Sequence, residues 1–126
     1  MPPTLDLDYH PGCLPKQIDV ALPTMNAEPR LRNTLEMMAE AFENSVISVN
    51  RLIVVDGGSS DGTLEISEDV AREQGWEYYV ADGEYTLPEA RERLVQLVET
   101  EWFFFQDDTK VIEPDYITHL VNAVSP

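Results

Sequence analysis

Short apolar runs alternate along the chain with longer stretches in which apolar residues recur every three or four positions. The runs IDVAL, LIVV, WEYYV and EWFFF are too short for helices and are rich in β-branched and aromatic residues. They predict strands near residues 18–22, 52–55, 76–80 and 101–105. Because proline cannot donate a hydrogen bond to a sheet, we expect the first strand to end at Pro23.

The stretches between and after these runs have helical periods. Residues 29–44 are predicted to form a helix, because four large apolar residues fall on one stripe: Leu31, Leu35, Met38 and Phe42. A second helix is expected over residues 63–74. Thr86 is predicted to cap a third helix with Pro88 in its first turn, and Pro114 to open a fourth.

Strands that alternate with helices predict an α/β fold, a Rossmann-like three-layer αβα arrangement with a mostly parallel sheet. Residues 1–17 contain four prolines and no apolar period, so we expect an irregular N-terminal arm before a single domain over residues 18–126. Ligands of such sheets bind beyond the carboxyl ends of the strands. Three polar loops should therefore meet at one edge: PTMNAE, DGGSSDGT and QDDT.

The charge of the chain limits its partners. It has 24 acidic and 8 basic residues and a formal net charge of −16. Such a surface repels a phosphate backbone, which argues against a nucleic-acid partner. An acidic, lysine-poor surface also suits high salt, where screening removes self-repulsion. A halophilic source and an ordinary acidic surface are two interpretations, which the salt dependence of stability distinguishes.

Cysteine content and hydropathy indicate the compartment. Cys13 is the only cysteine, which excludes an internal disulfide and a thiolate metal cluster. No stretch approaches the roughly 18 apolar residues that a membrane span needs. The start, MPPTLDLDYH, has acids where a signal peptide has positive charge. We expect a cytoplasmic protein.

Motifs from four parts of the chain carry a resemblance to a known family. In order, ALPTMNAEPRLRNTL, IVVDGGSSDGT, ARERLVQ and WFFFQDDTKVIEPDYI resemble the nucleotide-binding half of the inverting glycosyltransferases of family 2, which have the GT-A fold. The resemblance implies transfer of a sugar from a nucleoside diphosphate sugar to an acceptor hydroxyl, usually with a divalent metal, Mn²⁺ or Mg²⁺. It places the catalytic base in a second half of the domain. No residue here is assigned that role, and we expect a donor-binding part completed by a missing C-terminal half or a partner chain.

The resemblance also implies which residues contact the donor. They are Pro23, Thr24, Asn26, Asp56, Gly58, Asp61, Arg91 and Asp107. Short polar side chains at a strand edge suit a nucleotide, and glycines let the backbone approach it. Where the family often has a second acid, this chain has Gly57. Asp61 has an alternative interpretation as a helix cap, and Arg30 is a second candidate, beside Arg91, for a cation near the diphosphate.

An acidic pair after the fourth strand is the candidate metal site. Carboxylates there can hold a hard divalent cation that neutralises a leaving pyrophosphate. Counting back from EPDYI aligns the family's metal-binding triplet with Asp107, Asp108 and Thr109, so that a hydroxyl replaces the last acid. With the register shifted by one, the triplet begins at Gln106 and the last acid is retained. A solvated acidic turn is the alternative.

Two other functions fit parts of the chain. The segment GGSSDGTLEISE has polar residues at the ligand spacing of an EF-hand loop, which would make the chain a calcium-binding module without catalysis. Its first ligand position is Gly57, however, and a strand precedes it. A receiver-like signalling domain would use Asp56 and Lys110, but it needs an acidic pair after the first strand, where this chain has LPTMN. A non-catalytic nucleotide-binding module is a further alternative.

Overall fold

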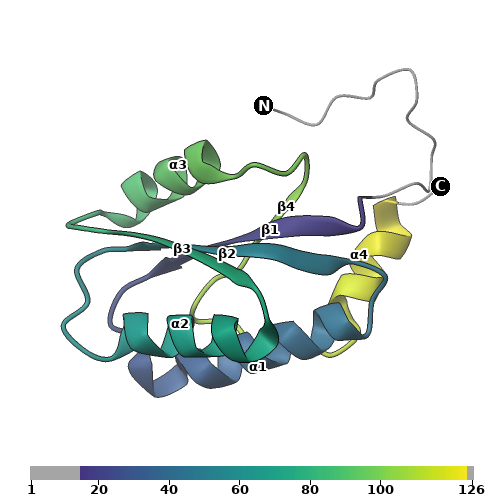
Figure 1. Ribbon diagram of the computed structural model, residues 1–126, viewed down its shortest axis with the longest axis horizontal. Coiled ribbons are helices and arrows are strands. Elements are labelled where there is room, and N and C mark those ends of the chain that lie inside the picture. The colour runs from purple at the N-terminus through teal and green to yellow at the C-terminus, as the bar shows by residue number, and fades with distance from the viewer. Residues whose placement is uncertain (1–14, 125–126) are drawn as a thin grey trace.

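The computed structural model of the chain describes residues 15–124. Strands and helices alternate along this region (Figure 1): β1 Gln17–Thr24, α1 Glu28–Glu43, β2 Ser48–Asp56, α2 Thr63–Gln74, β3 Glu77–Asp82, α3 Leu87–Leu97, β4 Phe103–Phe105 and α4 Tyr116–Val124. The predicted order of strands and helices is confirmed. Most of the expected arm, residues 1–14 with Cys13, lies outside the described residues.

The strands of residues 15–124 form one parallel sheet in the order β3-β2-β1-β4. In the pairing of β1 with β2, Thr24 lies opposite Asp56, and in the pairing of β2 with β3, Asp56 lies opposite Asp82. β4 pairs with β1 over Phe103–Phe105. The carboxyl ends of β1, β2 and β3 are therefore level, so the loops that follow them start side by side.

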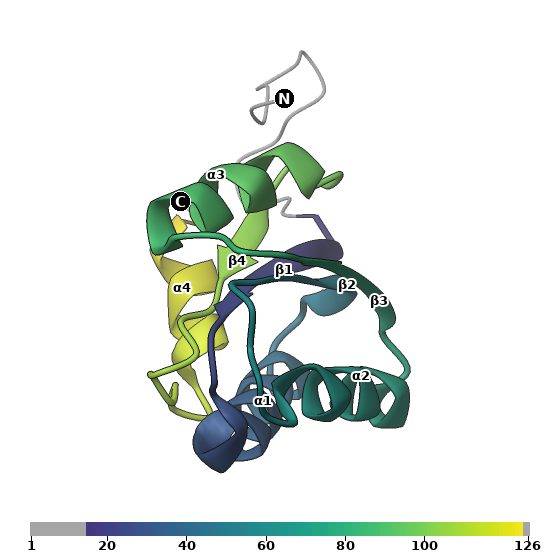
Figure 2. The ribbon, with the colours of Figure 1, turned by 90° about the vertical axis from the view of Figure 1, so that its left-hand side faces the viewer.

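Helices cover both faces of the sheet, which confirms the predicted three layers. α1 and α2 lie on one face with α4 beside α1, and α3 lies on the other, as both views show (Figures 1 and 2). The larger core cluster joins the sheet to α1, α2 and α4 and includes Leu22, Leu35 and Leu52. The smaller cluster joins the sheet to α3 through Ile53, Val55 and Leu94 and their neighbours.

Local sequence explains where the helices begin and end. The predicted stripe of α1 is buried. At the start of α3, Thr86 Oγ1 accepts from the Glu89 amide and the Glu89 carboxylate accepts from the Thr86 amide, a capping box. α2 ends at Gly75 with a φ of 77°. None of the helices in the described region is long and apolar enough to cross a membrane.

β1 does not end at Pro23, as the sequence suggested, but continues to Thr24. The Ala21 carbonyl accepts from the Gln106 amide at 2.9 Å, on the side of β1 that faces β4. The backbone N–H and C=O groups of successive residues in a strand point to opposite sides, so the backbone nitrogen of Pro23 points to the same side as the Ala21 carbonyl. At that height β4 has already ended. Its missing N–H therefore removes no ladder bond, and the strand extends far enough to bring Thr24 beside Asp56.

Candidate functional site

A cavity of about 500 Å³ opens at the carboxyl ends of the strands. Its wall combines the loop after β1, Gly57 after β2, the start of α3 and the loop after β4. Figure 2 looks onto this end of the molecule. Of the residues expected from the sequence, the cavity wall contains Pro23, Thr24, Arg30, Arg91, Asp107, Asp108 and Thr109.

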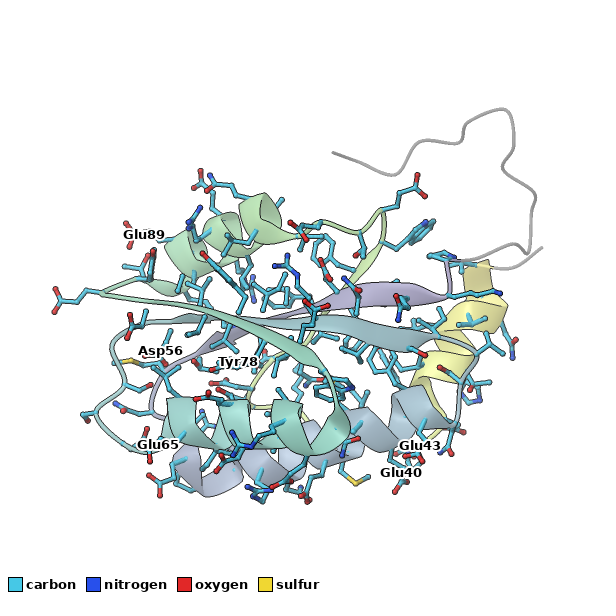
Figure 3. All side chains as sticks on the ribbon, in the orientation of Figure 1. Glu40, Glu43, Asp56, Glu65, Tyr78 and Glu89 are labelled. Carbon is cyan, nitrogen blue, oxygen red and sulfur yellow. The ribbon has the colours of Figure 1, made fainter. Side chains whose placement is uncertain are left out.

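Asp56 lies behind this wall and is 1% exposed. Its Oδ1 accepts from Thr24 Oγ1 at 2.7 Å and from Ser59 Oγ at 2.6 Å, and its Oδ2 accepts from the amides of Gly58 and Ser59 at 3.0 and 2.7 Å. Figure 3 shows Asp56 at the end of β2, close to the start of α2. Burial alone would raise the pKa of Asp56, but these hydrogen bonds outweigh it and hold the pKa below its ordinary value. Asp56 thus joins the loop after β1 to the loop after β2.

Asn26, Gly58 and Asp61 are also outside the cavity wall and belong to the same loop framework. Asn26 has a φ of 46°. Its side-chain Oδ1 accepts a hydrogen bond from the Ser60 backbone amide at 2.8 Å, and its backbone amide donates to Ser59 Oγ at 2.8 Å. Asp61 accepts from the amide and hydroxyl of Thr63 and from the amide of Glu28. These bonds fix the starts of α1 and α2 against each other.

Gly57 lies where the β3–α3 loop crosses the loop after β2. A Cβ atom on Gly57 would lie 2.8 Å from the Tyr85 carbonyl oxygen and 3.5 Å from Met25 Sδ. The first distance is shorter than packed atoms allow, and a backbone oxygen cannot move away as a flexible side chain can. The absence of a side chain at position 57, where the family often has an acid, therefore lets the β3–α3 loop close one side of the cavity.

The loop after β4 presents two carboxylates to the cavity. Asp107 Oδ1 accepts from the amide and hydroxyl of Thr109 at 2.9 and 2.7 Å. These bonds, with smaller effects of Lys110 and Arg91, hold the pKa of Asp107 below its ordinary value. Burial raises the pKa of Asp108, although the nearby Arg30 acts in the opposite direction.

Gln106 is not part of the cavity wall. Its side chain is buried and its Nε2 donates to the carbonyls of Asp107 and Lys110 at 2.7 and 2.8 Å, which holds the loop in a tight turn. The cavity wall therefore contains all three residues of the first register for the metal triplet, Asp107, Asp108 and Thr109. It does not contain Gln106, with which the second register begins.

Two arginines approach the same loop. Arg91, on α3, lies over the ring of Phe105 with 5.1 Å between the guanidinium carbon and the ring centroid. Arg30, in the first turn of α1, donates from Nε to the Asp108 carbonyl at 3.1 Å and lies 3.6 Å from the Asp108 carboxylate. In a chain with a net charge of −16, the cavity thus combines two cations with two acids.

The oxygen ligands fit a hard divalent cation only in part. Among residues 15–124, no three His, Cys, Asp or Glu side chains lie close enough together to hold a metal ion on their own. Magnesium is commonly held, however, by one or two carboxylates together with substrate phosphates. Asp107 Oδ2 accepts no hydrogen bond from the described residues. The pair of acids therefore fits a metal completed by a phosphate ligand.

The three loops expected to converge do not include the loop of residues 83–86 between β3 and α3, which forms another part of the cavity wall. It contributes Tyr85 and Thr86, and the start of α3 adds Leu87. The rule for parallel sheets could have found it, since β3 also ends at this edge. The EF-hand interpretation is wrong, because strand β2, and not a helix, leads into its first loop position at Gly57.

The family model described as Glycosyl transferase family 2 matches residues 19–125. The chain belongs to this family. The resemblance carried by the sequence motifs is therefore confirmed. No match is found among curated proteins.

The fold of the chain is similar to that of solved glycosyltransferase structures. S. aureus TarS 1–349 in complex with UDP is 24% identical, with a TM-score of 0.68, over 85% of this chain and 31% of that one. Glucosyl-3-phosphoglycerate synthase from Mycobacterium tuberculosis, in complex with Mn²⁺, UDP and glucosyl-3-phosphoglycerate, is 22% identical, with a TM-score of 0.59, over 85% of this chain and 39% of that one. The likeness confirms the GT-A fold, and the chain spans well under half the length of these proteins.

Proposed function

We propose that this chain binds a nucleoside diphosphate sugar, the donor of a family 2 glycosyltransferase, in the cavity at the carboxyl ends of the strands. One observation carries the proposal: Thr24, Gly57, Arg91 and Asp107 come from four separate segments and line the same cavity. Its volume of about 500 Å³ suits a small ligand. The UDP in the similar structures supports a diphosphate nucleotide as that ligand.

The charged groups of the cavity suit a diphosphate. A guanidinium can donate two parallel hydrogen bonds to phosphate oxygens, and Arg91 is held at the cavity wall by its contact with Phe105. We propose that Arg91 binds the diphosphate, and that Thr24 and the backbone beside Gly57 contact the nucleoside. Asp56, Asn26, Gly58 and Asp61 act indirectly, by holding these loops in place.

Asp107 and Asp108 are the proposed holders of a divalent metal, Mn²⁺ or Mg²⁺, with Thr109 beside them. Bound there, the ion supplies positive charge against the leaving diphosphate. The manganese in the glucosyl-3-phosphoglycerate synthase complex supports this part of the proposal. Because residues 15–124 offer only two carboxylates at the cavity, we expect strong metal binding only when the nucleotide is present.

Transfer also needs a base that removes the proton of the acceptor hydroxyl. A base must reach that proton, and the carboxylates at the described cavity wall belong to the acids proposed to hold the metal. We therefore propose that the base comes from a missing C-terminal half or from a partner chain. On its own, the chain is expected to bind the donor without transferring the sugar.

Calorimetry with UDP tests the donor site. We expect weak binding of UDP without metal, weak binding of Mn²⁺ without nucleotide, and affinity at least about tenfold higher when both are present, since each completes the ligand set of the other. The double variant Asp107→Asn/Asp108→Asn should abolish this coupling. No heat of binding with millimolar UDP, Mn²⁺ and wild-type protein would rule the function out.

The acidic surface leads to a separate proposal, that the protein is adapted to high salt. Of its charged residues, 24 are acidic and 8 are basic. The Debye length falls from about 10 Å at 0.1 M salt to about 3 Å at 1 M, which screens repulsion between exposed acids. We expect the urea midpoint to rise steeply between these KCl concentrations. A flat or falling midpoint would contradict this proposal, and sucrose, which is uncharged, is the control for general exclusion effects.

A further inference from the structure

Arg30 contacts Asp108, one of the two acids proposed to hold the metal. Its guanidinium donates to the main-chain carbonyl of Asp108 at 3.1 Å and lies 3.6 Å from the carboxylate of the same residue. Arg30 and Asp108 are 78 positions apart in sequence, and their contact joins the first turn of α1 to the loop after β4. The contact lies at the cavity, since both residues line it.

The two partners differ in how firmly they are held. The side chain of Asp108 is 13% exposed, whereas that of Arg30 is 42% exposed. A carboxylate that is mostly removed from water needs a positive partner. A half-exposed arginine on a helix surface can change its rotamer at little cost. The contact can therefore be exchanged from the side of Arg30 while Asp108 stays in place.

We propose that Arg30 is an exchangeable counter-ion of the donor site. In the protein without ligands it neutralises Asp108, and it releases this carboxylate when a nucleoside diphosphate and a divalent cation bind. Its guanidinium then turns to the diphosphate. This inference rests on the proposed function of the cavity and adds to it the regulation of the acid pair.

The exchange follows from the chemistry of the guanidinium. Arginine binds carboxylate and phosphate with the same planar arrangement of N–H donors, so one side chain can serve both partners. In the absence of nucleotide, Arg30 competes with a metal ion for Asp108. In its presence, Arg30 gains a phosphate partner and the competition ends. Removing Arg30 should therefore change the affinities for metal and for nucleotide in opposite directions.

The substitution Arg30→Gln tests this with two probes. Titration with Mn²⁺ alone, followed by the EPR signal of free Mn²⁺, should show affinity about three- to tenfold higher than in the wild type, since the competing charge is gone. Calorimetry with UDP at saturating Mn²⁺ should show affinity lower by about tenfold, since a charge-assisted contact to phosphate is lost.

Arg32→Gln is the matched control. Arg32 lies on the same helix with the same side-chain exposure of 42%, but it pairs with Glu36 and Glu73 and is not at the cavity. Neither affinity should change in this variant. Arg30→Lys, which keeps the charge without the planar fork, should leave Mn²⁺ affinity near the wild-type value and lower UDP affinity less than Arg30→Gln does.

The outcomes separate this inference from the proposed function. If wild-type protein binds UDP with Mn²⁺ but Arg30→Gln binds Mn²⁺ alone no more tightly than the wild type, the exchange is wrong and the donor site stands. If Arg30→Gln loses affinity for both probes, Arg30 only braces the loop and the exchange is again wrong. If the wild type does not bind UDP, both proposals fail.

Discussion

Asp19→Ala should lower the free energy of unfolding by about 3–5 kcal/mol, the cost typical of removing one partner from a buried ion pair. Asp19 is 0% exposed at the start of β1. Its Oδ2 lies 3.6 Å from the guanidinium of Arg51, whose side chain is 15% exposed. Without the carboxylate, the positive charge of Arg51 stays in the protein interior, and the other acid near it among the described residues, Glu99, is exposed.

Asp19 also satisfies backbone groups that alanine would leave unpaired. Its Oδ2 accepts from the amide of Glu99 at 2.8 Å and more weakly from that of Thr100 at 3.3 Å, and its Oδ1 accepts from Asn50 Nδ2 at 2.8 Å. These bonds fasten the turn between α3 and β4 to the sheet. Domains of this size are stable by only about 5–15 kcal/mol, so the loss would take a large part of the total.

Urea denaturation at a salt concentration where the wild type is fully folded measures this effect. The control is Glu99→Ala, which removes the other acid near Arg51: that pair spans 3.5 Å, but the Glu99 side chain is 72% exposed. Exposed pairs contribute about 0–1 kcal/mol, so this variant should remain close to the wild type. Equal losses in the two variants would show that burial does not decide the strength of these contacts.

The Asp19 cluster marks the limit of what sequence patterns predict here. IDVAL predicted β1 through its apolar residues, and nothing in that run indicates a role for Asp19. Its partner amides lie 80 and 81 positions away, in a turn that no local period describes. The fold class was predictable because strand and helix periods are local and parallel sheets need helices between their strands. The side-chain contacts that fasten the turns were not, because they depend on how distant segments meet.

The cavity was predictable to a similar extent. The family resemblance led to Arg91, and the rule that ligands bind at the carboxyl ends of parallel strands led to the loops of Thr24 and Asp107; all three residues line the cavity. The same rule could not tell which polar side chains face the ligand and which face the loops. Asp56 looked like a ligand contact, yet in the structure both of its oxygens are occupied within the protein.

Asp56→Asn should lower the free energy of unfolding by about 3 kcal/mol and also weaken UDP binding at least about tenfold. In asparagine, an NH₂ group replaces one of the two carboxylate oxygens, and an NH₂ group cannot accept the hydrogen bonds that this oxygen accepted. Each buried donor left without an acceptor lowers the free energy of unfolding by about 1–3 kcal/mol. Thr24 and the backbone after β2 would lose their common partner. Because Thr24 and Gly57 line the cavity, the loss should reach the ligand through the loops.

The pH dependence gives this prediction a second readout. The pKa of Asp56 is lower in the folded protein than its ordinary value, so the carboxylate stabilises the fold at neutral pH. That contribution is complete above the pKa of the unfolded chain and is lost as the pH falls through the folded pKa. The difference in unfolding free energy between wild type and Asp56→Asn should therefore be largest near neutral pH and shrink in acid.

Asp82→Asn is the matched control for Asp56→Asn. Asp82 ends the neighbouring strand in register with Asp56, but it is exposed and does not line the cavity. Exposed substitutions of this kind usually change stability by less than about 0.5 kcal/mol. If Asp56→Asn kept wild-type stability and lost only UDP affinity, Asp56 would have to contact the nucleotide directly. The loops would then have to open on binding, since the closed arrangement leaves neither carboxylate oxygen free.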